Sequence, residues 1–175
     1  PRTIIDVGMN IGMNTVEYST FAKKVIGFEP TPWVYDWACK NIKWNKHNVD
    51  YDKPALLQGK KNLTAQIETH QMGLGANAQT DVTFFSQPKN NGHNSVAYNK
   101  NFKKDTIVRQ FKADIATIDM FRYNDVDFIK IDTEGYELPV LQGAKDTIAR
   151  CRPAIQCEIV PPQCRRANYQ ALDIW

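Results

Sequence analysis

The sequence predicts an α/β fold, namely a Rossmann-like, mostly parallel sheet with helices on both faces. Short apolar runs at Thr3–Val7, Val25–Phe28 and Val126–Ile131 are typical of strands that are buried on both sides. Segments with helical periodicity follow these runs, and the first run ends in a glycine turn. We therefore expect these strands in one sheet, with the first beside Val126–Ile131.

The other strands are expected from similar patterns. Apolar and β-branched residues predict strands at Thr64–Met72, Val82–Phe85 and Ile107–Phe111, the last near an edge of the sheet. Asn90–Asn94 is rich in asparagine and is expected to be a loop. Ala154–Val160 is expected to be the final strand of the same sheet, because two prolines follow it.

The second helix is expected to begin at Thr31, with the threonine hydroxyl as its N-cap and Pro32 in its first turn. Its tryptophans, Trp33, Trp37 and Trp44, recur at helical spacing. This spacing favours packing against the core over a ligand-binding role.

Two further helices are expected on either side of the predicted sheet. Gly12–Ala22 is compatible with a helix that turns Val16 and Phe21 inward. Glu137–Cys151 has a continuous apolar face, and Pro139 fits the first turn of that helix.

Length and composition favour one domain, residues 1–175, with 42% hydrophobic residues. The polar stretch His47–Asn62 is expected to be an insertion with a short helix around Ala55–Leu57. The chain begins without a methionine, and Ala167–Trp175 resembles an unfinished helix. We therefore expect a fragment of a longer chain that lacks the C-terminal strands of its sheet.

Charge and cysteine content argue against several classes of protein. The net charge of +3 does not indicate a polyanionic partner, so nucleic acid is not expected. The four cysteines contain no C-x-x-C pair, which favours free thiols over disulfides or zinc. No apolar run approaches the roughly 18 residues of a membrane span, and no signal peptide is visible. A cytoplasmic protein is expected, with its oligomeric state left open.

A glycine turn follows the first strand. In the stretch Asp6 to Gly12, the glycines at positions 8 and 12 allow the backbone to approach a ligand closely. The dinucleotide fingerprint needs a glycine at position 10, where Asn10 stands, so the turn suits a cofactor without a pyrophosphate. The alternative is an ordinary tight turn. The carboxylate of Glu29 follows the second strand, where an acidic residue accepts hydrogen bonds from ribose hydroxyls in such folds.

Charged residues also gather at the ends of the last two strands of the predicted sheet. Lys130 and Asp132 lie at the end of Val126–Ile131, and Glu158 lies on the final strand. Charges there are costly to bury unless they are used or paired. Asp132 is expected to act on a substrate hydroxyl, whereas Lys130 and Glu158 fit either a catalytic role or a local network. Glu137 is expected to assist the start of the helix that follows.

The chain resembles the FkbM family of S-adenosylmethionine-dependent methyltransferases. The resemblance runs with gaps from Ile4 to about Glu158 and is carried by the stretches Ile5–Thr15, Gly27–Pro30, Thr117–Asp119, Val126–Glu137 and Val140–Ala144. It implies the class I methyltransferase fold, S-adenosylmethionine as cofactor, and O-methylation of sugars, polyketides or related hydroxylated metabolites. The cofactor contacts that it implies come from Asp6, Gly8, Asn10, Gly12, Thr15, Glu29 and Asp132.

The three histidines lie far apart in the sequence, and no metal site is expected. His93, in the predicted asparagine-rich loop, is a candidate general base, although a loop histidine is more often part of the surface.

Three functions remain in competition. An O-methyltransferase acting on a small molecule or a saccharide hydroxyl is favoured. An RNA ribose 2'-O-methyltransferase is suggested only by Lys130, Asp132 and Glu158. The third alternative is a catalytically silent module with a cofactor-binding fold. Base N-methylation is disfavoured, because the turn after Val126–Ile131 lacks the Asp/Asn-Pro-Pro-aromatic motif expected there.

Overall fold

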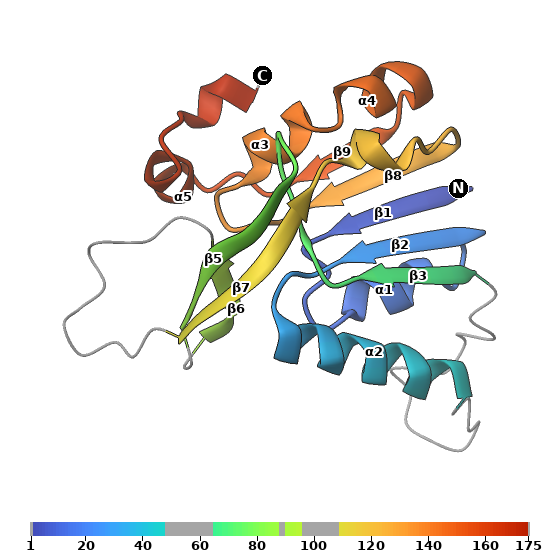
Figure 1. Cartoon of the computed structure of the whole chain (residues 1–175). Helices are drawn as coiled ribbons and strands as arrows, with labels where there is room; N and C mark the ends of the chain where they lie inside the picture. The colour runs from blue at the N-terminus through green and yellow to red at the C-terminus, as the bar shows by residue number, and fades with distance from the viewer. Residues whose placement is uncertain (1, 48–64, 88–89, 96–108, 175) are drawn as a thin grey trace.

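The computed structural model describes residues 2–47, 65–87, 90–95 and 109–174, and it confirms the α/β fold (Figure 1). Within these residues, the main sheet has five parallel strands in the order β3-β2-β1-β8-β9. In that order the strands are Gln66–His70, Lys24–Phe28, Thr3–Val7, Val126–Ile131 and Ala154–Cys157. As predicted, β1 lies beside β8, and the register places Asp6 next to Lys130.

Each face of the main sheet packs against its own apolar cluster. Ile5 and Val7 of β1 pack in one cluster with Val140, which comes from a helix after β8. Ile4, which directly precedes Ile5 in the strand, packs in the other cluster with Ala22, which follows the first helix. Alternate residues of a strand point to opposite faces, so both faces are covered. Figure 1 shows α1 (Met13–Tyr18) and α2 (Pro32–His47) on one side of the sheet and the helices after β8 on the other.

The helices are shorter or more divided than the sequence predicts. Helix α1 spans Met13–Tyr18 instead of Gly12–Ala22, and Phe21 is 53% exposed, so the prediction that it points inward is wrong. The predicted helix Glu137–Cys151 consists of two helices, α3 (Glu137–Gln142) and α4 (Lys145–Cys151).

The break between α3 and α4 occurs at a close backbone contact. A Cβ atom on Gly143 would lie 2.0 Å from the carbonyl oxygen of Gly75. The carbonyl of Gly143 also accepts a hydrogen bond from the amide of Asp119. A continuous helix was therefore the wrong prediction, because glycine lets a neighbouring loop touch the backbone at this point.

Helix α2 (Pro32–His47) presents a different face to the core from the one predicted. Trp37 and Trp44 are 59% and 64% exposed, so core packing is wrong for both. Smaller apolar residues face inward instead, with the same four-residue spacing: Val34, Ala38 and Ile42. The helix begins at Pro32 as predicted, and the carbonyl of Thr31 accepts its first hydrogen bond, from the amide of Tyr35. The predicted hydroxyl cap is wrong, because the side chain of Thr31 bonds no amide of the first turn, and the amide of Thr31 donates to Glu29.

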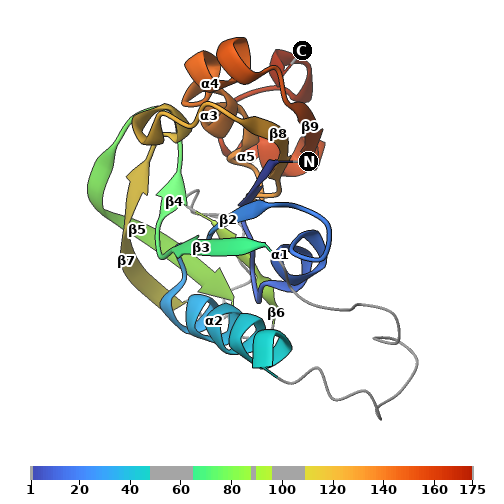
Figure 2. The same cartoon turned by 90° about the vertical axis from the view of Figure 1, so that its right-hand side faces the viewer.

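A second sheet, which the sequence analysis did not anticipate, lies across the carboxyl ends of the main strands (Figure 1). Its order is β4-β7-β5-β6, with bounds Gly73–Leu74, Arg109–Ala116, Gln79–Gln87 and Asn90–Ser95. The predicted loop Asn90–Asn94 is thus a strand, because it pairs antiparallel with β5 through backbone groups that every residue carries. Figure 2 shows this sheet reaching from α2 toward the pair α3 and α4.

The C-terminal part also differs from prediction. Strand β9 ends at Cys157 instead of Val160, and the two prolines begin helix α5 (Pro161–Arg166), since proline suits the first turn of a helix. Beyond α5, only the short 3-10 helix η2 (Ala171–Ile174) occupies the region predicted as a longer helix.

Three predictions fall wholly or partly on residues outside the described ranges: the insertion with its helix around Ala55–Leu57, and the starts of the strands from Thr64 and from Ile107. Within the described ranges, no helix combines the length and the apolar character needed to cross a membrane.

Candidate active site

A cavity lies where the carboxyl ends of β1, β2 and β8 approach the second sheet. Its polar lining comes from the turns after these three strands and contains Gly8, Asn10, Glu29, Asp132 and Glu134. Ligands of open α/β sheets bind at this edge, beside the point where the strand order reverses. Four residues predicted from the sequence, Gly8, Asn10, Glu29 and Asp132, therefore share one cavity.

The turn after β1 passes close to β8 at Gly8. Gly8 has a φ of 73°, and a Cβ atom there would lie 1.9 Å from the carbonyl oxygen of Asp132. Its amide donates to the carbonyl of Phe28 at 3.0 Å, which ties the turn to β2. Only glycine satisfies both the backbone conformation and the contact.

The carboxylate of Glu29 is held from two sides. Its Oε2 accepts a hydrogen bond from the amide of Asn10 at 3.2 Å, and its Oε1 accepts one from the amide of Thr31 at 2.9 Å. Asn10 has a φ of 51°, which asparagine tolerates better than most residues. Glu29 is 6% exposed, and burial raises its pKa while these amides act in the opposite direction. A carboxylate oxygen has two lone pairs, so each oxygen can accept a further bond.

Asp6 and Thr15 support the turn from beneath and are not among the cavity-lining residues. The hydroxyl of Thr15 donates to Asp6 Oδ2 at 2.7 Å, and both residues are fully buried. Burial raises the pKa of Asp6, while the nearby positive charge of Lys130 acts to lower it. The contacts that the family resemblance implied for Asp6 and Thr15 are thus contacts within the protein in this structure.

Lys130 is a buried cation with three oxygen neighbours. Its Nζ donates to the carbonyl of Gly8 at 2.8 Å and lies 3.4 Å from both Asp6 Oδ1 and Asp132 Oδ2. Its side chain is only 6% exposed. It therefore joins the glycine turn to the end of β8 from the side of the sheet that faces α1, and it is not itself part of the cavity lining.

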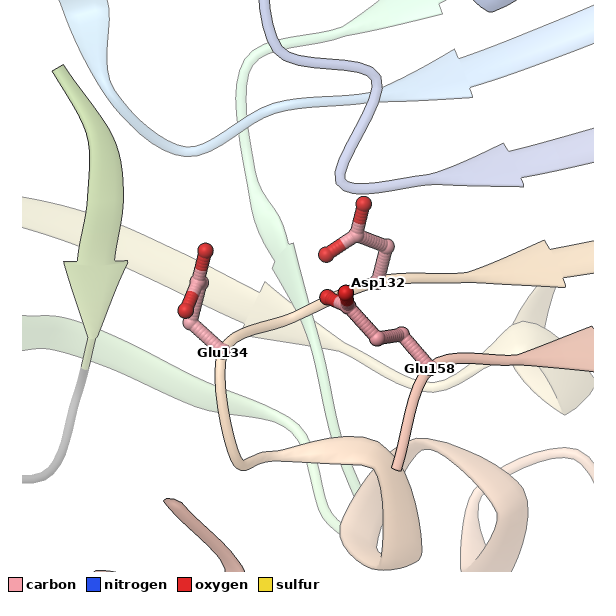
Figure 3. A group of neighbouring side chains, drawn as sticks. All are labelled: Asp132, Glu134 and Glu158. Atoms are coloured by element: carbon pink, nitrogen blue, oxygen red, sulfur yellow. The ribbon is translucent and has the colours of Figure 1, made fainter. Parts of the chain in front are cut away.

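Three carboxylates lie close together just beyond the carboxyl ends of β8 and β9. Asp132, Glu134 and Glu158 each place an oxygen within 4.8 Å of the others (Figure 3). A hydrogen bond and charge repulsion from Asp132 raise the pKa of Glu158. Glu158 thus holds its proton to higher pH than a separate glutamate would.

Glu137 fixes the turn between β8 and α3 through hydrogen bonds, a role that the sequence did not predict. Its Oε1 accepts hydrogen bonds from the amides of Thr133 and Gly135, both at 3.0 Å, and its Oε2 accepts one from the hydroxyl of Tyr169 at 2.9 Å. Glu134 and Gly135, within this turn, both have left-handed φ values, 56° and 103°. The buried carboxylate fixes the turn that carries Thr133 and Glu134 into the cavity, in addition to standing at the start of α3.

Sequence reasoning missed the apolar wall of the cavity. It is formed by Met72, Leu74, Phe84 and Ile115 from the region of the second sheet, together with Tyr136. No local motif marks these residues: Leu74, Phe84 and Ile115 meet through the pairing of β4, β5 and β7, while Met72 precedes β4 and Tyr136 precedes α3.

Three other residues in the site prediction are placed away from the cavity lining or lack a described side chain. Gly12 packs within 3.3 Å of Ala38 in α2, measured from an ideal Cβ position, so it brings two helices together. Glu158 is exposed and is not among the cavity-lining residues, but it lies beside Asp132 and Glu134, which are. His93 lies in β6, and its side chain is outside the described part of the structure.

Comparisons with known proteins agree with this geometry. The family model described as the methyltransferase FkbM domain matches residues 6–175. The crystal structure of a methyltransferase FkbM from Methylobacillus flagellatus KT has a similar fold, with a TM-score of 0.58 and 18% sequence identity over 90% of this chain. The chain spans about a third of that protein, 32% of its length. A search of curated protein sequences found no match.

Proposed function

Because the chain belongs to the FkbM methyltransferase domain family, we propose that it transfers a methyl group from S-adenosylmethionine to a hydroxyl oxygen of a sugar or another small metabolite. The observation that carries this proposal is the position of Asp132. Its carboxylate lies at the carboxyl end of β8 and lines the same cavity as Glu29 and the glycine turn. A proton acceptor and a cofactor-binding edge therefore share one space.

The cavity suits the proposed cofactor. Glu29 has acceptor capacity left for two ribose hydroxyls, and each bond would be to a charged group. The missing Cβ of Gly8 lets the turn lie against the carbonyl of Asp132, and the turn itself lines the cavity, where its backbone would face the amino-acid part of the cofactor. Met9 does not obstruct this space, because its buried sulfur packs toward Gly27, whose lack of a Cβ makes room for it.

The protein's own part in the reaction is then orientation and proton removal. S-adenosylmethionine supplies a methyl group that is already activated by its positive sulfur. Asp132 would accept the proton of the acceptor hydroxyl, and Lys130 would hold Asp132 at its ion-pair distance of 3.4 Å. Glu158, whose pKa is raised by the hydrogen bond and the charge of Asp132, would keep its own proton to higher pH beside that base.

The charge of the cavity mouth favours a neutral acceptor. Asp132, Glu134 and Glu158 together would repel a phosphate backbone, and among the described residues only Lys130 lies within ion-pair distance of Asp132. This disfavours the RNA ribose alternative, which needs cations along the path of the nucleic acid.

The proposal is tested in two steps. Calorimetric titration with S-adenosylmethionine should show binding, and labelled methyl transfer should then be measured against a panel of neutral sugars and hydroxylated metabolites. A chain that binds no cofactor would support a silent module. Cofactor binding with methyl transfer only to RNA would instead support the ribose methyltransferase.

A further inference from the structure

Helix α2 carries two large tryptophans on its outer side. Six of its residues are exposed: Asp36, Trp37, Lys40, Lys43, Trp44 and Lys46. Trp37 and Trp44 are seven residues apart, which places them within about 20° of each other around the helix axis. Single exposed apolar residues are common, but two tryptophans aligned in this way form an apolar patch of the kind that marks an interaction site.

The patch extends onto the turn before α1 and the first residue of that helix. Ile11 is 41% exposed and Met13 is 62% exposed. The side-chain amide of Asn41 in α2 donates to the carbonyl of Ile11 at 2.8 Å, so this turn lies directly against the helix. We call Ile11, Met13, Trp37 and Trp44 the tryptophan face. None of these four residues is among the cavity-lining residues.

Lysines border this face. Lys40 and Lys43 lie about 40° and 100° from Trp44 around the helix. The ammonium of Lys40 sits over the ring of Trp37, 5.2 Å from its centroid. Asp36 is the one carboxylate among the six exposed residues of α2, which leaves a positive surface beside the aromatic rings.

We propose that the tryptophan face docks the protein onto an anionic lipid surface. Tryptophan favours the boundary between headgroups and acyl chains, because its ring is apolar and its N–H still finds a partner. Lysines bordering such a face are attracted to anionic headgroups while their stems follow the apolar surface. The helix would lie in the plane of the surface, since it is too polar to cross it.

The observations favour lipid over nucleic acid as the occupant. The exposed residues of α2 include no arginine, the side chain best suited to paired contacts with phosphates. The apolar part also continues into the aliphatic side chains of Ile11 and Met13, which offer bases no stacking surface.

Docking in this way would bring the cavity close to the lipid surface. Trp33, at the start of α2, meets the ring of Phe111 edge-on at 5.2 Å, and Phe111 stacks on Phe84 at 5.3 Å. Phe84 lines the cavity. A chain of aromatic contacts therefore connects the docking helix with the cavity wall, and the docking itself does not depend on methyl transfer.

The test uses vesicles of phosphatidylcholine alone and of phosphatidylcholine mixed with phosphatidylserine. Wild-type protein should sediment with the mixed vesicles and show a blue shift of tryptophan fluorescence. The double variant Trp37→Ala, Trp44→Ala should lose binding by about tenfold or more. Lys40→Gln and Lys43→Gln should each weaken binding about fivefold and reduce its dependence on salt. Leu172→Ala removes an apolar residue that is 81% exposed at the other end of the chain, and it should bind like wild type.

Three results would overturn the proposal. The first is absence of binding to either kind of vesicle. The second is vesicle binding that the tryptophan double variant and both lysine variants leave unchanged. The third is tighter binding to a single-stranded RNA oligonucleotide than to the mixed vesicles. The lysine variants keep the test decisive if the tryptophan variant fails to fold.

Discussion

The ammonium of Lys130 lies 3.4 Å from a carboxylate oxygen of Asp132, although one group is buried and the other lines the cavity. The two residues stand at alternate positions at the end of β8, so they share a side of the backbone. The same ammonium reaches Asp6 and the carbonyl of Gly8. The orientation of Asp132 is thus coupled to the turn that we propose binds the cofactor.

Replacing Asp132 by asparagine should affect turnover more than folding. The change keeps the shape and removes the proton acceptor, so kcat should fall by roughly 10²–10⁴-fold while cofactor affinity and Tm change little. The measurement is methyl transfer to an acceptor found in the panel above. Asp125→Asn, at an exposed carboxylate elsewhere, is the control. Near-normal turnover in Asp132→Asn would leave proximity alone as the mechanism.

Replacing Glu29 by glutamine should weaken S-adenosylmethionine binding by about tenfold or more. A hydrogen bond to a charged group contributes about 1.5–3 kcal/mol, and the amide can accept through only one of its two polar atoms. Calorimetry gives the affinity. Unfolding is measured in parallel, because the amides of Asn10 and Thr31 also lose their charged partner. Unchanged affinity in a folded variant would remove Glu29 from the cofactor site.

Replacing Lys130 by methionine should cost about 3–5 kcal/mol of unfolding free energy, because it leaves the buried Asp6 without its counter-charge. The double variant Lys130→Met, Asp6→Asn should recover part of this loss, since no buried charge is then left alone. Urea unfolding of the four proteins in the cycle measures the coupling. Simple additivity of the two changes would show that the ion pair is energetically unimportant.

Glu158→Gln should make the protein more stable at neutral pH. The pKa of Glu158 is raised in the folded state, so the folded state holds its proton to higher pH and loses stability as pH rises through that range. The glutamine variant does not lose this stability as pH rises. The difference in stability between the variant and wild type should disappear below the ordinary pKa of glutamate. The gain should not exceed about 1 kcal/mol, because the group is exposed.

Asp127→Asn is the control of opposite sign, because the ion pair with Arg2 lowers the pKa of Asp127. That variant should lose stability at neutral pH and match wild type at low pH. Both series are measured by thermal unfolding in EDTA and again with magnesium. Stabilisation of wild type by magnesium, abolished in Glu158→Gln, would mean that the carboxylates bind a cation instead of holding a proton.

Much of the main sheet could be predicted from the sequence, because its signals are local. β1, β2 and β8 are short runs rich in Ile, Val and Phe, which suit strands buried on both faces. Glu29 and Asp132 could be recognised because each follows such a run directly. Predictions failed where the local sequence pattern was compatible with two different structures. Trp37 and Val34 both recur at helical spacing in α2, and only the packing against the sheet decides which one points inward.

The sequence by itself determined the alternation of strands and helices, the glycine turn after β1, and the acidic residues that end β2 and β8. Only the tertiary structure decided that a second sheet walls the cavity, that Lys130 lies beneath the glycine turn, and that Glu158 meets Asp132. The physical reason is distance along the chain. Lys130 and Gly8 are 122 residues apart, and no local periodicity records a contact that forms only when β1 and β8 pair.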